Sequence, residues 1–310
     1  MDITNSLDIS QEEIEPFLDE TTALDQQRRS QLRIIFDRFV RNKVAIVGAC
    51  FLIFMVVLCF LGPLVTGHNQ PDVTHPLDSL KPPSAAYPLG TDLIGHDQFA
   101  RVMYGGRLSL LVGLGSMLVA VFFGVTLGAF AGFYGGLIDN ILMRVTDIAL
   151  AVPAYLLLFL LSIAYSDGSP LSIILLISVL SWTYTARLVR GEFLALRERE
   201  YVLAARTIGA RGLRLMFRHI LPNAAGPIIV NATLLIGANI IFESVLSYFG
   251  FGLQPPAASW GNMVADGKGL LDVAPWMVIA PGLLIFLTVL SSNLVGDGLR
   301  DALDPRMTER

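Results

Sequence analysis

The sequence is poor in charged residues, in histidine and in cysteine. Only 15% of its 310 residues are Asp, Glu, Lys or Arg, against about 25% in ordinary soluble domains, whereas 54% are hydrophobic. A chain with so few charges cannot cover a water-facing surface, so we expect lipid to surround most of it. The high hydrophobicity excludes disorder, and the net charge of −4 provides no basic surface for nucleic acid.

Neither cysteine nor histidine occurs in a pattern that builds a metal or redox site. Cys50 and Cys59 lie in one apolar run, which favours buried free thiols over a disulfide scaffold. Asp266-Gly-Lys268 resembles the end of a phosphate-binding loop, but the required glycine spacing and the Ser or Thr are missing. We expect no catalytic residue, no bound metal and no cofactor in this chain. The histidines, which lack the spacings of zinc sites, are His68, His75, His96 and His219.

Long uncharged runs are what the sequence has in abundance. A helix needs about 20 apolar residues to cross roughly 30 Å of hydrocarbon, and five runs meet or approach that length. A sixth run, from His219 to Phe242, has Pro222 and Pro227 near its start, where a helix tolerates proline. The window 244–265 is broken by glycine and proline, so we expect it not to span. The six predicted spans are 44–66, 108–132, 146–166, 169–189, 223–247 and 274–296.

The distribution of Lys and Arg orients these spans, because positive residues are enriched in cytoplasmic segments. Eighteen of the 22 lie on the side that holds both termini, so both termini are predicted to be cytoplasmic. No convincing cleavage site follows the first apolar run, so we expect that span to be retained. The predicted cytoplasmic segments are 1–43, with an amphipathic helix at about 30–42, 190–222 and the tail 297–310; the extracytoplasmic ones are 67–107 and 248–273.

The connection between the fourth and fifth spans carries eight arginines against three glutamates. Residues 201–208 are rich in helix formers, and Gly209 follows them as a residue suited to a left-handed C-terminal cap. After Arg211-Gly212 we expect a second short helix that leads to Pro222. One interpretation is that the arginines only fix topology and bind lipid head groups. The other is a docking surface for a soluble cytoplasmic partner, because two small alanines beside a glycine turn permit close approach.

Two features inside the membrane concern helix packing. Gly124, Gly128 and Gly132 repeat every fourth residue and share one helical face, where backbones can approach closely. We expect this face to pack against another helix. Asp147 and Glu243 lie near span ends, so structural pairing is expected for them in preference to ion transport.

Several motifs in order along nearly the whole chain resemble the oligopeptide and dipeptide ABC-importer permeases, in particular their second permease subunit. Ala204-Ala205-xxx-Gly209, with Pro222 thirteen residues further on, resembles the EAA loop of these permeases, with Leu203 at the usual glutamate position. The other matching segments are Phe39-Val-Arg-Asn-Lys43, 89–97, 106–110, Met143-Arg-Val-Thr-Asp-Ile148 with Pro153, 246–252 with 255–256, 259–261, and 296–306.

This resemblance implies an all-α, polytopic type I ABC importer permease fold with six transmembrane helices in a bacterial plasma (inner) membrane. It implies three kinds of protein partner besides membrane lipid, and no nucleic acid. They are a homologous second permease subunit, two ATPase subunits that use ATP and Mg, and an extracytoplasmic substrate-binding protein that delivers peptides. The residues that the resemblance assigns to ATPase coupling are Tyr201, Ala204, Ala205 and Gly209, with Pro222 joining them to the fifth span.

Other functions stay open at this point. An ion-gradient-driven secondary transporter would carry its own inverted repeats and broken mid-membrane helices. An importer of nickel chelates or of another small solute would share the same motifs. An intramembrane enzyme is disfavoured by the missing His, Cys and acidic clusters, and composition alone leaves a pure scaffold open.

Overall fold

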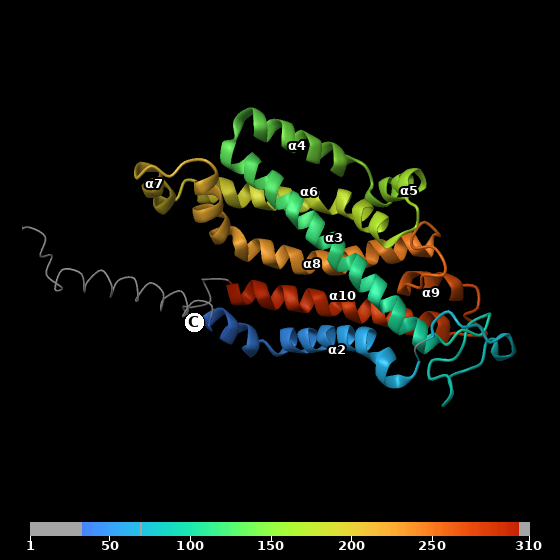
Figure 1. The fold of residues 1–310 in the computed structure, drawn as a ribbon. Helices are drawn as coiled ribbons and strands as arrows, with labels where there is room; N and C mark the ends of the chain where they lie inside the picture. The colour runs from blue at the N-terminus through green and yellow to red at the C-terminus, as the bar shows by residue number, and fades with distance from the viewer. Residues whose placement is uncertain (1–32, 69, 304–310) are drawn as a thin grey trace, which may run out of the picture.

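The computed structural model describes residues 33–68 and 70–303, which form a bundle of long helices (Figure 1). Within these residues no β-strand occurs beyond one isolated bridge between Thr91 and Asp97. The predicted all-helical fold is therefore confirmed for this part of the chain. Of the expected amphipathic helix at about 30–42, residues 33–41 are helical, and residues 1–32 lie outside the described part.

Five helices are long and apolar enough to cross a membrane. Their ends follow from local capping: the Asn42 side chain accepts a hydrogen bond from the backbone N–H of Ala45 at the start of α2, and Gly67 ends that helix at φ 74°. The five are α2 (Lys43–Thr66), α3 (Gln98–Tyr134), α6 (Pro170–Leu196), α8 (Leu221–Tyr248), which continues a helical segment η2 (Leu215–Ile220), and α10 (Trp276–Leu303).

Helix α3 begins ten residues before the span expected at 108–132. The Asp97 side chain caps it by accepting from the N–H of Phe99 at 2.9 Å. Arg101 and Arg107 interrupt the apolar run without ending the helix, because Arg107 donates to the carbonyl oxygens of Cys59 and Phe60 on α2 at 2.7 and 3.1 Å. A charged side chain whose polar end is satisfied in this way is compatible with a continuous helix.

The structure divides the region of the third expected span, 146–166, between α4 (Gly136–Ala151) and α5 (Ala154–Tyr165), which meet at 92°. Pro153 follows the break, and proline disfavours helical geometry in the residue before it. The pair is long and apolar enough to make a sixth, broken span. Helix α4 thus already occupies residues that were expected to form a connection.

The helices pack in a consistent order. Helix α10 lies between α2 and α8, and α3 crosses the bundle diagonally with its most extensive contact along α6 (Figure 1). The start of α2 and the end of α10 meet at one end of the bundle, where Gly298 packs on Ala45. The short helix α7 (Glu200–Thr207) projects at this same arginine-rich end, whereas α9 (Trp260–Gly267) and the turn η1 (Pro76–Asp78) lie at the opposite end (Figure 1).

Candidate functional site

Helix α7 projects at the arginine-rich end of the bundle and follows α6 and precedes η2 and α8 along the chain (Figure 1). The helix ends where predicted: Gly209 is left-handed with φ 96°, and the N–H of Ala210 donates to the carbonyl of Ala205 at 3.0 Å. No other part of the described chain comes within 4 Å of a side chain built at Gly209. The backbone conformation, rather than crowding by this chain, is therefore what requires glycine there.

Helix α7 has a buried face and an exposed apolar face. Val202 and Ala205 pack into a core cluster with Phe193 and Met216, and Ala205 is only 5% exposed. The exposed face contains Tyr201, Leu203, Ala204 and Ile208, and Ile208 is 87% exposed.

The two alanines of the motif therefore have different environments. The methyl group of Ala204 is open to a partner, while that of Ala205 is held inside this chain and anchors α7 to the bundle. Partial burial raises the pKa of Tyr201, although Arg199 acts in the opposite direction. Tyr201 therefore keeps a neutral hydroxyl at physiological pH.

Pro222 lies in the first turn of α8, directly after the π-helical segment η2. Because proline lacks an N–H and its ring crowds the carbonyl four residues earlier, a wider turn before it lets the helical path continue. The short helix expected after Arg211-Gly212 is therefore present as η2, and it passes through Pro222 into α8 without a break. Leu215, Met216 and Ile220 bury this junction in the same cluster that holds Ala205.

The structure places all three glycines of the α3 face against α6. A Cβ atom at Gly124 would lie 2.9 Å from the carbonyl oxygen of Trp182, and one at Gly132 would lie 2.7 Å from that of Arg190. A Cβ atom at Gly128 would lie 2.9 Å from the Cβ atom of Val189. These distances are shorter than van der Waals contact, so the present spacing of α3 and α6 depends on glycine at each position.

Ion pairs tie α4 to α6 near the same end. Arg190 binds Asp139 through two nitrogens, with N···O distances of 2.5 and 2.7 Å, and Arg187 Nη2 lies 2.5 Å from Asp147 Oδ1. Asp147 thus takes part in structural pairing, as the sequence analysis expected.

At the opposite end, Glu243 is fully buried where α3, α8 and α9 meet. Its two carboxyl oxygens accept hydrogen bonds from Ser247 Oγ at 2.7 Å and from Ser109 Oγ at 3.2 Å. Ser109 in turn accepts from the backbone N–H of Trp260, the first residue of α9, at 3.1 Å. Glu243 on α8 is therefore joined to α3, through Ser109 134 positions earlier, and by way of Ser109 to the start of α9. Only the i, i+4 spacing of Glu243 and Ser247 was visible in the sequence.

A second polar group at this end was not found from the sequence. Arg101 on α3 donates to Asp92 Oδ2 at 2.8 Å, and Asp92 also accepts from the backbone N–H of His96 at 2.8 Å. Burial opposes ionisation of Asp92, but the hydrogen bonds from His96 and the positive charge of Arg101 outweigh it, so the pKa of Asp92 is lowered. The loop before α3 is thereby fixed to α3.

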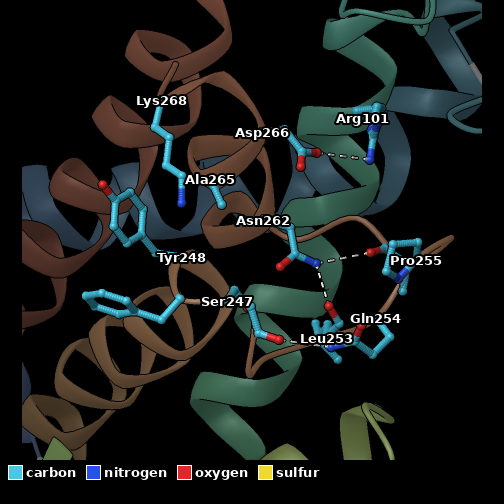
Figure 2. A pocket seen from close by; sticks show the side chains of 13 residues that line it. Arg101, Ser247, Tyr248, Leu253, Gln254, Pro255, Asn262, Ala265, Asp266 and Lys268 are labelled. Atoms are coloured by element: carbon cyan, nitrogen blue, oxygen red, sulfur yellow. Dashed lines mark hydrogen bonds and ion pairs between the residues drawn. The ribbon is translucent and has the colours of Figure 1, made fainter. Parts of the chain in front are cut away.

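A pocket of about 340 Å³ opens beside this group, between the end of α8, the following turn and α9 (Figure 2). Tyr248 and Lys268 line one side of it, and Asp266 faces Arg101 on the other, with 4.0 Å between Asp266 Oδ2 and Arg101 Nη2. Burial raises the pKa of Asp266, against the lowering effect of Arg101. No group of His, Cys, Asp and Glu in the described ranges could hold a metal ion.

Comparison with known proteins identifies the family of the chain. Residues 124–309 match the family described as "Binding-protein-dependent transport system inner membrane component", and residues 30–83 match the "N-terminal TM domain of oligopeptide transport permease C". The chain is 40% identical to the oligopeptide transport system permease protein OppC of Bacillus subtilis, over 87% of this chain and 88% of that protein. It is 41% identical to the dipeptide transport system permease protein DppC of Alkalihalophilus pseudofirmus, over 90% and 91% of the two chains.

Further relatives agree on family and fold. The glutathione transport system permease protein GsiD of Pectobacterium atrosepticum is 37% identical over 91% of this chain and 94% of its own. A solved structure of the MetNI methionine ABC transporter in an inward-facing conformation superposes with a TM-score of 0.53 at 17% identity, covering 66% of this chain and 97% of that one. The fold is thus that of a type I ABC importer permease, and the chain belongs to the binding-protein-dependent transport system inner membrane components, among the OppC- and DppC-like permeases.

Proposed function

We propose that this chain is one of two permease subunits of an ATP-driven importer in the bacterial inner membrane, and that it carries peptides delivered by an extracytoplasmic binding protein. The chain itself binds no cofactor in this proposal. Two partner ATPase subunits use ATP and Mg, and the homologous second permease subunit completes the pathway. The relatives named for oligopeptide, dipeptide and glutathione transport support a peptide-like cargo.

The observation that carries the proposal is the exposed apolar face of α7. Tyr201, Leu203 and Ile208 are large side chains open at the arginine-rich end, which the charge bias assigns to the cytoplasm. Exposed apolar groups rimmed by charge are typical of a protein interface. Because Val202 and Ala205 pack into the bundle, a force applied to this face is transmitted to α6 and α8.

Gly209 provides the test of this coupling. In the reconstituted complex, Gly209→Val should abolish ATP-driven peptide uptake without affecting membrane insertion, because a β-branched residue does not tolerate φ 96°. The matched control is Gly67→Val at the opposite end, which also has a positive φ, 74°, and no neighbour within 4 Å. The control variant should keep most of its uptake.

Two results would contradict the proposal. If Gly209→Val kept as much uptake as a working Gly67→Val control, α7 would not couple to an ATPase. Uptake that needs a proton gradient and ignores ATP would instead favour the secondary transporter. If a nickel chelate but no peptide competed for uptake, the chain would still belong to an ATP-driven importer, but its substrate would not be a peptide.

A further inference from the structure

The pocket at the end opposite α7 has an unusual distribution of charge. Lys268 Nζ lies over the ring of Tyr248, 4.8 Å from its centroid, and forms no ion pair within the described residues. Among the residues that the structure describes, Asp266 has one ion pair, the 4.0 Å contact with Arg101 Nη2, and Arg101 Nη1 lies closer to Asp92, at 2.8 Å. One cation without a carboxylate partner and one weakly paired carboxylate therefore face the same opening.

The two amide side chains that line the pocket already bind its walls. Asn262 Nδ2 donates to the carbonyl oxygen of Leu253 at 2.8 Å. Gln254 Nε2 donates to the carbonyl oxygens of Gly250 and Gly252 at 3.3 and 3.2 Å. These amides hold the turn after α8 in place, which leaves the charges of Lys268 and Asp266 for a ligand.

The floor of the pocket is held by the buried carboxyl group described above. Ser247 lines the pocket and donates to Glu243 at 2.7 Å, so α3, α8 and α9 fix its position together. A volume of about 340 Å³ is at the lower end of the range for small-molecule sites. It holds a small molecule or the end of a chain, but not the surface of a folded domain.

We propose that this pocket binds the end groups of a short peptide, with Lys268 receiving the C-terminal carboxylate and Asp266 receiving the N-terminal ammonium group. A zwitterion matches the cation of Lys268 and the weakly paired carboxylate of Asp266. The tyrosine ring beside Lys268 adds an apolar surface for a peptide side chain. This assignment rests on the proposed function, because it requires that peptides reach the outer end of the permease.

Peptides blocked at one end test each charge separately. The assembled transporter in lipid nanodiscs, without its binding protein, would be titrated with dialanine and trialanine, with their C-terminal amides and with their N-acetyl forms. Lys268→Met should weaken the binding of the free peptides about tenfold and leave the binding of the C-terminal amides unchanged. Asp266→Asn should weaken the binding of the free peptides by a similar factor and leave the binding of the N-acetyl forms unchanged. Lys81→Met and Asp72→Asn, which remove like charges outside the pocket, are the controls and should change nothing.

Three outcomes would overturn the assignment: no binding of free peptides by the unmodified complex, equal losses for free and blocked peptides, or equal losses in the control variants. ATP-driven uptake of the same peptides with the binding protein present separates the two proposals. Uptake without any dependence on the pocket residues refutes the pocket alone. Charge-dependent binding without uptake of any peptide refutes the proposed function and leaves the pocket standing.

Discussion

Replacing Gly128 with alanine adds one methyl group where α3 meets α6. The new Cβ atom would lie 2.9 Å from Val189 Cβ and closer still to the carbonyl oxygen of Ala186, which is backbone and cannot rotate away. Overpacking of this kind costs about 1–3 kcal/mol. The same change at Gly191 on α6 meets no atom of residues 33–68 or 70–303 within 4 Å, so the higher helix propensity of alanine should stabilise that variant by roughly 0.5–1 kcal/mol.

The opposite signs of these two changes make the comparison decisive. Thermal unfolding of the purified permease complex in detergent should shift by a few degrees downward for Gly128→Ala and slightly upward for Gly191→Ala. Gly128→Leu should lower the midpoint further. If Gly128→Ala and Gly191→Ala unfolded at the same temperature, α3 and α6 would be free to separate, and the role in helix packing assigned to the glycine face would be refuted.

Substitutions at Glu243 and Asp92 test the end of the bundle opposite α7, and substitutions at Asp139 and Asp147 test α4. Glu243→Gln should keep uptake because its amide oxygen still accepts from one serine and its NH2 group donates to the hydroxyl oxygen of the other. Glu243→Leu should destabilise the complex by about 1–3 kcal/mol in thermal unfolding, because it leaves the buried serine hydroxyls without this partner. The pKa of Asp92 is lowered in the folded state, so its carboxylate stabilises the fold fully above the ordinary pKa near 3.8, and this stabilisation is lost as the pH falls through the lowered pKa. Asp92→Asn should therefore speed proteolysis of the loop before α3 at pH 7 but make no difference in strong acid. Asp139→Asn should lower the unfolding midpoint more than Asp147→Asn, since Asp139 is the less exposed carboxylate and holds Arg190 through two nitrogens.

The sequence was sufficient to locate most of the helices, because the cost of charge in hydrocarbon excludes Asp, Glu, Lys and Arg from long runs. It also predicted the turn after α7, because few residues other than glycine adopt the conformation of Gly209. Both predictions depend on local chemistry that a single stretch of chain contains. The same is true of the α3 glycine face, whose period of four is visible without any knowledge of its partner helix.

What the sequence did not show are pairings between distant residues. Arg190 and Asp139 are 51 positions apart, and Ser109 and Glu243 are 134 apart, so no periodicity connects them. Arg107 closed the long apolar run at its N-terminal side and so misplaced the start of α3, because its acceptors on α2 are 47 and 48 positions away. Polar side chains in such a bundle are positioned by tertiary hydrogen bonds, and these become predictable only once the neighbouring helix is known.

Helix α8 physically connects the two ends of the molecule. Its first turns, at Ala224 and Ile228, belong to the core cluster that holds α7, and its last turns provide Glu243 and Ser247 beneath the outer pocket. Pro227 removes one backbone donor from the first turns of α8, but the helix continues without a break to Tyr248, so a displacement of α7 that tilts α8 also moves the floor of the pocket. Because Glu243 ties α8 to α3 and α9, the pocket walls would move together with that floor. The geometry therefore favours a change in pocket position over a change in pocket shape when force is applied at α7.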